Sequence, residues 1–276
     1  MAAKSAARKP CLVLKLGGEL LEKPQDVQRI ARGIRTLAAR ASLTVVHGGG
    51  KEIDAALALA GIPKRQVDGL RVTDAPTLEA VVAVLAGSIN TRLVAAVREA
   101  GGAPVGLTGA DAGVAVVKRA APIMSTAGES VDLGLVGTPA PGGDPALLVD
   151  LMSRGYVPVV ACVGATTKGQ LLNVNADTLA SHLAVRLKAR RLVIAGGTAG
   201  VLDADGRTIA RLTSREAARP VKAGTANKGM VAKLQACRDA LKHGVGDVLV
   251  ANGRRLEFET LGDSKAQQPD CTQVVR

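Results

Sequence analysis

Aromatic side chains are almost absent from this chain of 276 residues, which has no Trp, one Tyr and one Phe. Bases of single-stranded nucleic acids stack on such side chains, so their absence weighs against nucleic-acid binding. The formal net charge of +12 does not restore that function, because the basic residues are scattered apart from the pairs Arg190-Arg191 and Arg254-Arg255. We therefore expect small anionic molecules, and no nucleic acid, as partners of this positive charge.

Cysteine and histidine are also scarce. The four Cys lie far apart with no CxxC spacing, and the three His form no cluster with metal-ligand spacing. This pattern argues against a disulfide framework or a metal knot and is typical of a reducing compartment. We assign no metal ligand, and we assign none of the His to catalysis.

Long apolar segments are missing as well. The basic stretch of ten residues at the N-terminus is not followed by an apolar stretch of signal-peptide length, and no run is long enough to span a membrane. We expect a cytoplasmic protein with no membrane partner.

The hydrophobic residues make up 47% of the chain, and without aromatics the core must be built from Val, Leu, Ile and Ala. Strand-like runs alternate with helical patterns, which predicts an α/β fold with a largely parallel sheet covered on both faces. The expected strands are 11–16, 43–47, 103–107, 114–118, 157–162, 171–175, 191–196 and 247–251. The expected helices are 24–41, 51–60, 75–100, 145–154, 176–188 and 229–243.

A chain of this length is near the size at which a single core stops growing. We expect two lobes, residues 1–168 and 169–276, which meet at the turn-rich stretch 166–170. The segment 123–143 is rich in Gly, Pro, Ser and Thr, and this composition predicts a mobile hairpin or loop that covers the substrate side as a lid.

Two of the predicted strands end in glycine clusters. The first strand carries Lys15 just before Gly17 and Gly18, and the second leads into the three glycines 48–50. Glycine lets backbone N–H groups approach an anion, a lysine supplies a charge for phosphate, and the helix after the second cluster presents its N-terminus. Turns needed only for packing explain the glycines but not a lysine at the end of an apolar strand. Two anion cradles in one chain predict two anionic reactants.

Two single basic residues have both a functional and an ordinary interpretation. Arg71, in a turn-like segment, can hold a substrate carboxylate with its guanidinium fork or form a surface ion pair with Asp68 or Asp74. Lys233 lies one turn inside the last long helix, where a lysine is solvent-exposed by default.

Polar side chains also gather where one predicted strand ends. Strand alternation places Asn173 and Asn175 on one face, and Asp177 lies where the next helix begins. Asp177 can serve only as the N-cap of that helix. Amides and a carboxylate at the carboxyl end of a strand are also typical of the ligand crevice of an open α/β sheet.

Taken in order, six motifs resemble those of the amino-acid kinase superfamily and, within it, the acetylglutamate kinases of arginine biosynthesis. The motifs are Lys-Leu-Gly-Gly (15–18), His-Gly-Gly-Gly (47–50), Gly-Leu-Arg-Val-Thr (69–73), Leu-Gly-Leu-Val-Gly (133–137), Asn-Val-Asn-Ala-Asp (173–177) and Gly-Met-Val-Ala-Lys (229–233). The resemblance covers essentially the whole chain from Leu12 onward.

This resemblance implies a three-layer αβα sandwich with a central, mainly parallel sheet. The first lobe would bind an acylated amino acid and the second would bind ATP together with Mg2+. The implied reaction is ATP-dependent phosphorylation of the γ-carboxylate of N-acetyl-L-glutamate.

The resemblance also implies a role for each residue of the motifs. Lys15 and Lys233 would flank the transferred phosphoryl group, and Asp177 would orient them. The acylated glutamate would be held by Gly49, Gly50, Arg71 and Asn173, and Gly17 and Gly18 would donate backbone N–H groups to the phosphates.

This set suits the chemistry of a carboxylate nucleophile. With a reference pKa of about 4.3, the γ-carboxylate is ionised at neutral pH and needs no general base. It needs charge compensation instead, because two anions about 4 Å apart repel by roughly 4 kcal/mol at an effective dielectric constant near 20. Two other functions stay open: a kinase for an N-acylated or carrier-linked aminoadipate, and a non-catalytic amino-acid-binding sensor with the same fold.

The chain departs from the family pattern at Gly197, where relatives carry an acidic residue near the nucleotide. Only ten residues precede Cys11, whereas arginine-inhibited members carry an additional N-terminal helix. We therefore expect a homodimer that arginine does not inhibit. The apolar helix 77–100, which carries little charge, is the expected subunit contact.

Overall fold

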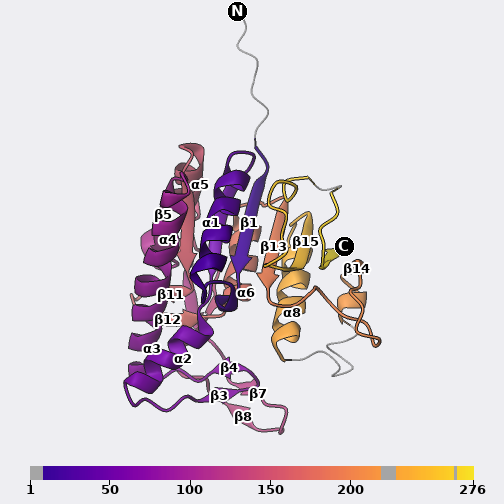
Figure 1. Cartoon of the computed structure of the whole chain (residues 1–276). Coiled ribbons are helices and arrows are strands. Elements are labelled where there is room, and N and C mark those ends of the chain that lie inside the picture. Colours follow the sequence, from indigo (N-terminus) through magenta and orange to yellow (C-terminus); the bar gives the residue numbers. More distant parts are fainter. Residues whose placement is uncertain (1–8, 219–227, 264–265) are drawn as a thin grey trace, which may run out of the picture.

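A central sheet of eight strands organises the computed structural model, which describes residues 9–218, 228–263 and 266–276 (Figure 1). The strands are β1 (Cys11–Leu16), β2 (Ser42–His47), β5 (Pro104–Thr108), β10 (Val157–Ala161), β13 (Arg191–Gly196), β14 (Arg211–Thr213), β15 (Asp247–Asn252) and β16 (Cys271–Val275). Their order across the sheet is β14-β16-β15-β13-β1-β2-β10-β5.

Most of this sheet is parallel. All neighbouring strands from β5 to β15 run parallel, and the direction reverses only where β16 pairs with β15. β1, β2 and β13 are buried along almost their whole length, as continuous apolar runs in a parallel sheet require. The mainly parallel sheet predicted from the sequence is confirmed.

Helices cover both faces of the sheet. They are α1 (Pro24–Ala38), α2 (Gly50–Leu59), α3 (Ala75–Val82), α4 (Asn90–Glu99), α5 (Ala146–Ser153), α6 (Ala176–Arg186) and α8 (Lys228–Lys242). α1 packs with α4 on one face, whereas α5, α6 and α8 lie on the other, as right-handed crossovers dictate (Figure 1). The predicted three-layer αβα sandwich is therefore confirmed.

The longest helix combines α3 and α4 through a π-helical segment, Ala83–Ile89. The sequence predicted one helix here. We also expected no segment long enough to span a membrane, and this helix contradicts that expectation by its length and composition alone. The most apolar 18-residue window of this 25-residue helix has a mean hydropathy of 1.8. In the fold, Val81, Leu85 and Leu93 on this helix are buried in the hydrophobic core, which explains its apolar character without a membrane.

A smaller sheet and two hairpins extend the fold near α2 and α3. The sheet has the order β11-β12-β9-β6, and its strands are β6 (Val117–Arg119), β9 (Val136–Pro139), β11 (Val163–Ala165) and β12 (Leu171–Val174). One hairpin pairs β3 (Gln66–Val67) with β4 (Leu70–Arg71), and the other pairs β7 (Ile123–Met124) with β8 (Ser130–Val131). The segment 123–143 thus contains a hairpin, as predicted, and also β9.

The two hairpins are joined to each other at the lower end of the molecule (Figure 1). The backbone N–H and the hydroxyl of Thr126 donate to the carboxylate of Asp68 at 2.7 and 2.8 Å. Asp68 and Gly69 both have positive φ, at 51° and 78°, which closes the β3–β4 turn tightly.

The stretch 166–170, where we placed the boundary between lobes, is a hairpin turn closed by the Thr166 N–H bonded to the Gln170 carbonyl at 2.9 Å. It links the paired strands β11 and β12. The central sheet itself continues across both lobes, because β1 of the first pairs with β13 of the second. The assignment of acyl-amino-acid and nucleotide binding to separate lobes stays a prediction.

Candidate active site

The carboxyl ends of β1 and β2 bring the two glycine clusters into direct contact. A Cβ atom on Gly18 would lie 2.7 Å from the Cα of Gly49 and 3.0 Å from the backbone N of Gly50. Only glycine permits this approach of one backbone to another. In the sheet, β1 lies between β2, which follows it in the chain, and β13, which comes much later. The strand order therefore reverses at β1, and open α/β sheets bind ligands at such a switch point.

Two lysines distant in the sequence meet at one carboxylate beside these glycines. The Nζ of Lys15, on β1, lies 2.8 Å from Oδ1 of Asp177 in the first turn of α6. The Nζ of Lys233, on α8, lies 3.9 Å from Oδ2 of the same carboxylate. Lys15 and Asp177 are only 7% exposed in their side chains and Lys233 is 17% exposed. The solvent-exposed alternative for Lys233 is therefore wrong.

The environment of Lys15 keeps it charged. Burial lowers the pKa of its ammonium group, but the charge and hydrogen bond of Asp177, together with the charge of Glu19, outweigh burial and raise that pKa above its usual value. Lys15 thus supplies a fixed positive charge at the cluster of glycines.

Asp177 is free for this pairing because another residue caps α6. The side chain of Asn175 accepts hydrogen bonds from the N–H groups of Asp177 and Thr178 at 2.9 and 3.1 Å. The alternative that Asp177 serves only as the N-cap is wrong. Since a carboxylate in the first turn also gains from the helix dipole, α6 holds Asp177 firmly in place.

Backbone donors near the glycines fall into two groups. Gly49 is the N-cap of α2 without a side-chain cap, so the N–H groups of the first turn, which begins at Gly50, have no partner within the helix. Gly17, in contrast, donates its N–H to the carbonyl of Ala195 on β13 at 2.9 Å. The N–H of Gly17 is therefore already used. The N–H of Gly18, at the start of a 3-10 turn, makes no such backbone hydrogen bond within the described chain.

Arg71 reaches back to α2 from β4. Its Nη2 donates to the carbonyl of Gly50 at 3.2 Å and forms a close ion pair with Asp54, and its side chain is only 8% exposed. Neither predicted surface partner is used, because Asp68 and Asp74 engage other groups. Among the residues that the structure describes, Nη1 of Arg71 is buried without a hydrogen-bond partner.

Asn173, on β12, is joined to the Arg71 segment by a short chain of hydrogen bonds. Its Nδ2 donates to Oγ1 of Thr73 at 3.2 Å, and that hydroxyl donates to the carbonyl of Arg71 at 3.4 Å. Asn173 therefore contacts Thr73, whereas Asn175 caps α6, although strand alternation places both residues on one face. The residues predicted for the acylated amino acid, Gly50, Arg71 and Asn173, do come together.

We predicted no role for Glu19, which lies between the first glycine cluster and β13. Its Oε1 accepts the N–H of Gly197 at 2.9 Å. A Cβ on Gly17 would lie 2.4 Å from Oε2, so the carboxylate rests directly on that glycine. Glu19 thereby places an acidic group beside Gly197, where we had noted that one is missing. A glutamate after two glycines forms no distinctive sequence pattern. Its position becomes evident only because β1 and β13 are neighbours in the sheet, which brings Glu19 to Gly197.

His47 and Cys162, which lie behind the glycines, are inert. Burial lowers the pKa of His47 to about 4, so the imidazole is neutral; its Nε2 accepts a hydrogen bond from the amide of Asn90 at 3.1 Å. Burial raises the pKa of the Cys162 thiol to about 12. These groups support the site without reacting in it.

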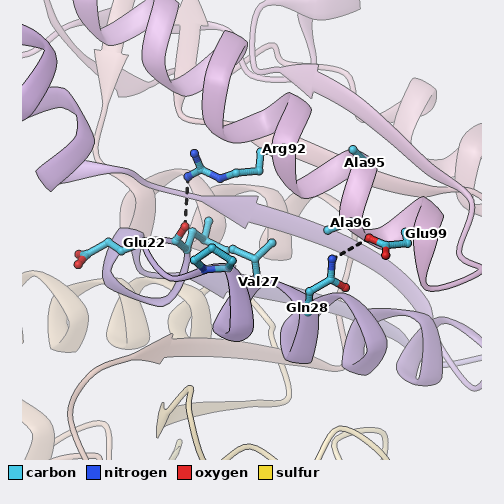
Figure 2. Close-up of a pocket in the computed structure, with 9 residues that line it drawn as sticks. Glu22, Val27, Gln28, Arg92, Ala95, Ala96 and Glu99 are labelled. Carbon is cyan, nitrogen blue, oxygen red and sulfur yellow. Dashed lines mark hydrogen bonds between the residues drawn. The ribbon is translucent and has the colours of Figure 1, made fainter.

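A surface cavity of about 360 Å³ lies elsewhere, between α1 and α4 (Figure 2). Its polar side chains already satisfy one another, because Arg92 donates to the Leu21 carbonyl and Gln28 donates to Glu99. None of the predicted site residues lines it. This cavity is therefore not the candidate site. We place the site at Lys15, Lys233 and the two glycine clusters.

Comparisons with known proteins identify the family of the chain. The model of the amino acid kinase family matches residues 10–252. The acetylglutamate kinase of Rhodopseudomonas palustris (strain BisB5) is 40% identical over 248 residues, which cover 88% of this chain and 83% of that protein. The acetylglutamate kinase of Zymomonas mobilis is 39% identical over 247 residues, 88% of this chain and 82% of that protein.

Solved structures share the fold. N-acetylglutamate synthase from Neisseria gonorrhoeae, complexed with coenzyme A and N-acetyl-glutamate, superposes with a TM-score of 0.80 at 24% identity; the match covers 98% of this chain but only 60% of the synthase. Carbamate kinase from Giardia lamblia bound to AMP-PNP gives a TM-score of 0.68 at 14% identity and covers 97% of this chain and 98% of that one. With its fold and most of its length matched, the chain belongs to the amino acid kinase family.

Proposed function

We propose that this chain is an acetylglutamate kinase, which transfers the γ-phosphoryl group of ATP to the γ-carboxylate of N-acetyl-L-glutamate. The observation that carries the proposal is the meeting of Lys15 and Lys233 at the Asp177 carboxylate, beside two glycine clusters. The relatives at about 40% identity, which are acetylglutamate kinases, support the substrate. They give no support to the aminoadipate kinase or to the silent sensor.

In the proposed reaction a γ-carboxylate oxygen attacks the γ-phosphorus, and the bond from that phosphorus to the bridging oxygen breaks, so that ADP leaves with the electron pair. Such transfers depend on positioning and on charge stabilisation. The ammonium groups of Lys15 and Lys233 stabilise the charge on the migrating group from two sides. Asp177 keeps both lysines oriented and keeps Lys15 protonated.

The acylated amino acid would bind between Arg71, Asn173 and the start of α2. The buried, unpartnered Nη1 of Arg71 is the donor we assign to the α-carboxylate, since a guanidinium matches the geometry of a carboxylate. The uncapped N–H groups at Gly49 and Gly50 are the donors we assign near the γ-carboxylate, where the helix dipole favours negative charge.

ATP would bind on the side of β13 and α8, with Gly18 donating its N–H to a phosphate. When bound, Mg2+ would neutralise charge on the phosphates. The described residues contain no cluster of three metal-ligating side chains, which fits an ion held mainly by phosphates and water. Glu19 would be the carboxylate available to help hold that ion, because it lies beside Gly17 and Gly197 at the edge of the site.

We also propose that the protein is a cytoplasmic homodimer. The helix α3–α4 exposes small residues along one side; they are Ala83, Gly87, Ser88, Thr91 and Ala95. Small side chains allow two such helices to approach closely across a two-fold axis. Light scattering should give the mass of two chains, and a monomer at micromolar concentration would contradict the proposal.

A coupled assay of ADP release tests the proposed activity. We expect turnover with N-acetyl-L-glutamate to exceed that with N-acetyl-L-aminoadipate and with N-succinyl-L-glutamate. The expected kcat/KM ratio over the aminoadipate derivative is roughly tenfold or more, because one methylene is worth about 1–3 kcal/mol in a pocket. Preference for the aminoadipate derivative, or no turnover with any of the three, would contradict the proposal.

A further inference from the structure

A second cavity, of about 350 Å³, opens between α1 and the chain that follows β15. Guanidinium groups dominate its wall, and Glu259 is the carboxylate among the residues that line it. The arginines are Arg29 and Arg32 from α1 and Arg254 and Arg255 from the segment after β15. The last two form one of the basic pairs noted in the sequence, which the proposed kinase activity does not use.

The two walls of this cavity are locked together. A Cβ on Gly33 of α1 would lie 2.3 Å from the ring of Phe258, so this glycine makes room for the ring, which is buried. The guanidinium of Arg40 also donates to the carbonyl of Glu259 at 3.0 Å. The arginines on the two walls are therefore held at a fixed separation.

Three of the four guanidinium groups are oriented by contacts that leave donors free. Arg29 donates to the carbonyl of Gly253 at 2.7 Å, Arg254 pairs with Asp26 at 3.3 Å, and Arg255 pairs with Asp270 at 2.9 Å. A guanidinium has five N–H donors, so each keeps several for a ligand.

Arg32 is different, because its guanidinium makes no hydrogen bond or ion pair with any residue that the structure describes. The acidic groups on or beside the wall are Glu259, Asp26 and Asp270, one fewer than the arginines. Burial and the nearby charges of Arg254 and Arg32 lower the pKa of Arg29, although Asp26 opposes them. The cavity thus has an excess of positive charge without a described counter-ion.

We propose that this cavity binds a small molecule that carries phosphate groups. The forked donors of a guanidinium match the oxygens of phosphate, and a multiply charged anion offsets the mutual repulsion of the four arginines. The cavity is separate from the candidate active site, since neither Lys15, Asp177 nor Lys233 lines it. The two sites are neighbours, however, because Arg254 also donates to the carbonyl of Glu19 at 2.9 Å.

Titration calorimetry with inorganic pyrophosphate tests this site, on protein saturated with AMP-PNP and at about 0.15 M salt to suppress weak surface attraction. We expect one pyrophosphate per chain. The double variant Arg32→Gln, Arg255→Gln should bind at least tenfold more weakly, and Arg32→Gln alone at least threefold. Arg35→Gln is the matched control, because Arg35 is exposed on the same helix but does not line the cavity, and it should bind within twofold of the wild type.

Three results would overturn the proposal: no binding to the wild type, unchanged affinity in the double variant, or an equal loss in Arg35→Gln, which would indicate general attraction to a basic chain. Circular dichroism checks that all variants fold, which we expect because the substituted side chains are exposed. The inference does not rest on the kinase activity. If AMP-PNP does not bind, the same comparison is made without it.

Discussion

The carboxylate of Asp177 holds its two lysines at different distances, with Nζ of Lys15 at 2.8 Å and Nζ of Lys233 at 3.9 Å. Lys15 is therefore held in a tight, buried ion pair, whereas Lys233 is held by charge and by a long contact of 3.5 Å to the Gly229 carbonyl. The two ammonium groups and the Asp177 carboxylate together carry one net positive charge, and the carboxylate of Glu19 also acts on Lys15. This arrangement attracts an anion and lets Lys233 adjust to it.

Replacing Asp177 with Asn should change the pH dependence of catalysis. In the wild type, the pKa of Lys15 is raised, so the ammonium group persists up to alkaline pH. Without Asp177, burial lowers that pKa, and the group loses its proton as pH rises through the lower value. We expect kcat of Asp177→Asn to fall as pH rises through that lowered pKa, in an alkaline range over which the wild type stays flat.

Profiles of kcat against pH for both proteins provide the measurement. Asn175→Ala serves as a control, because it weakens the cap of α6 by about 1 kcal/mol but leaves the charge in place. Its profile should keep the wild-type shape. Parallel profiles for Asp177→Asn and the wild type would contradict the role assigned to Asp177.

Substituting Arg71 with Lys should weaken binding of the acylated amino acid. A lysine keeps the charge but loses the forked donors, of which Nη1 is the one we assign to the substrate. We expect KM for N-acetyl-L-glutamate to rise at least tenfold, equivalent to about 1.4 kcal/mol, with KM for ATP within twofold. An equal rise in both KM values would instead indicate a general disruption of the fold.

A methyl group at Gly18 should destabilise the protein. Its Cβ would meet the backbone of Gly49, which cannot move without displacing α2. We expect Gly18→Ala to lower the free energy of unfolding by about 1–3 kcal/mol, as overpacking does elsewhere. Urea unfolding measures the change, and Gly262→Ala is the control because a Cβ there meets nothing within 4 Å. Equal stability of the two variants would show that the glycine clusters do not touch.

His47 should make the fold sensitive to mild acid. Its pKa is about 4 when folded and about 6.5 when unfolded, so only the unfolded state takes up a proton as pH falls between these values. The contribution to stability is fully present above about pH 6.5 and declines by about 3 kcal/mol by pH 4. Urea unfolding at several pH values should show this decline, and His47→Gln should reduce it. An identical acid decline in the variant would exclude His47 as its cause.

The sheet and the helices could be predicted because their apolar patterns are local. β1, β2 and β13 are rich in Val, Leu and Ile, and the helices that cover them have clear starts and stops. β16 was missed because its burial alternates and its pairing depends on β15 and β14, far along the chain. The predicted strand 114–118 became the shorter β6, which pairs with β9 outside the central sheet.

The candidate site likewise contains residues that could be predicted from the sequence and residues that could not. The glycines, Lys15, Lys233 and Asp177 could be grouped from motif order, since each lies in or next to a predictable element. The partners of Arg71, in contrast, depend on a contact with Asp54 across a turn, and the ordinary alternative named the wrong aspartates. Glu19 could not be identified, because its role is set by a contact with Gly197, which directly follows β13, far away in the sequence.

The kcat of Lys233→Ala with saturating ATP and N-acetyl-L-glutamate tests the central claim most directly, because Lys233 contributes little to the core and its replacement leaves the pair of Lys15 and Asp177 intact. Loss of one preformed charge stabiliser should lower kcat by about 100-fold or more, with KM for both substrates nearly unchanged. A purified, folded Lys233→Ala enzyme with kcat close to that of the wild type would contradict the claim that two lysines meeting at Asp177 stabilise the transferred phosphoryl group.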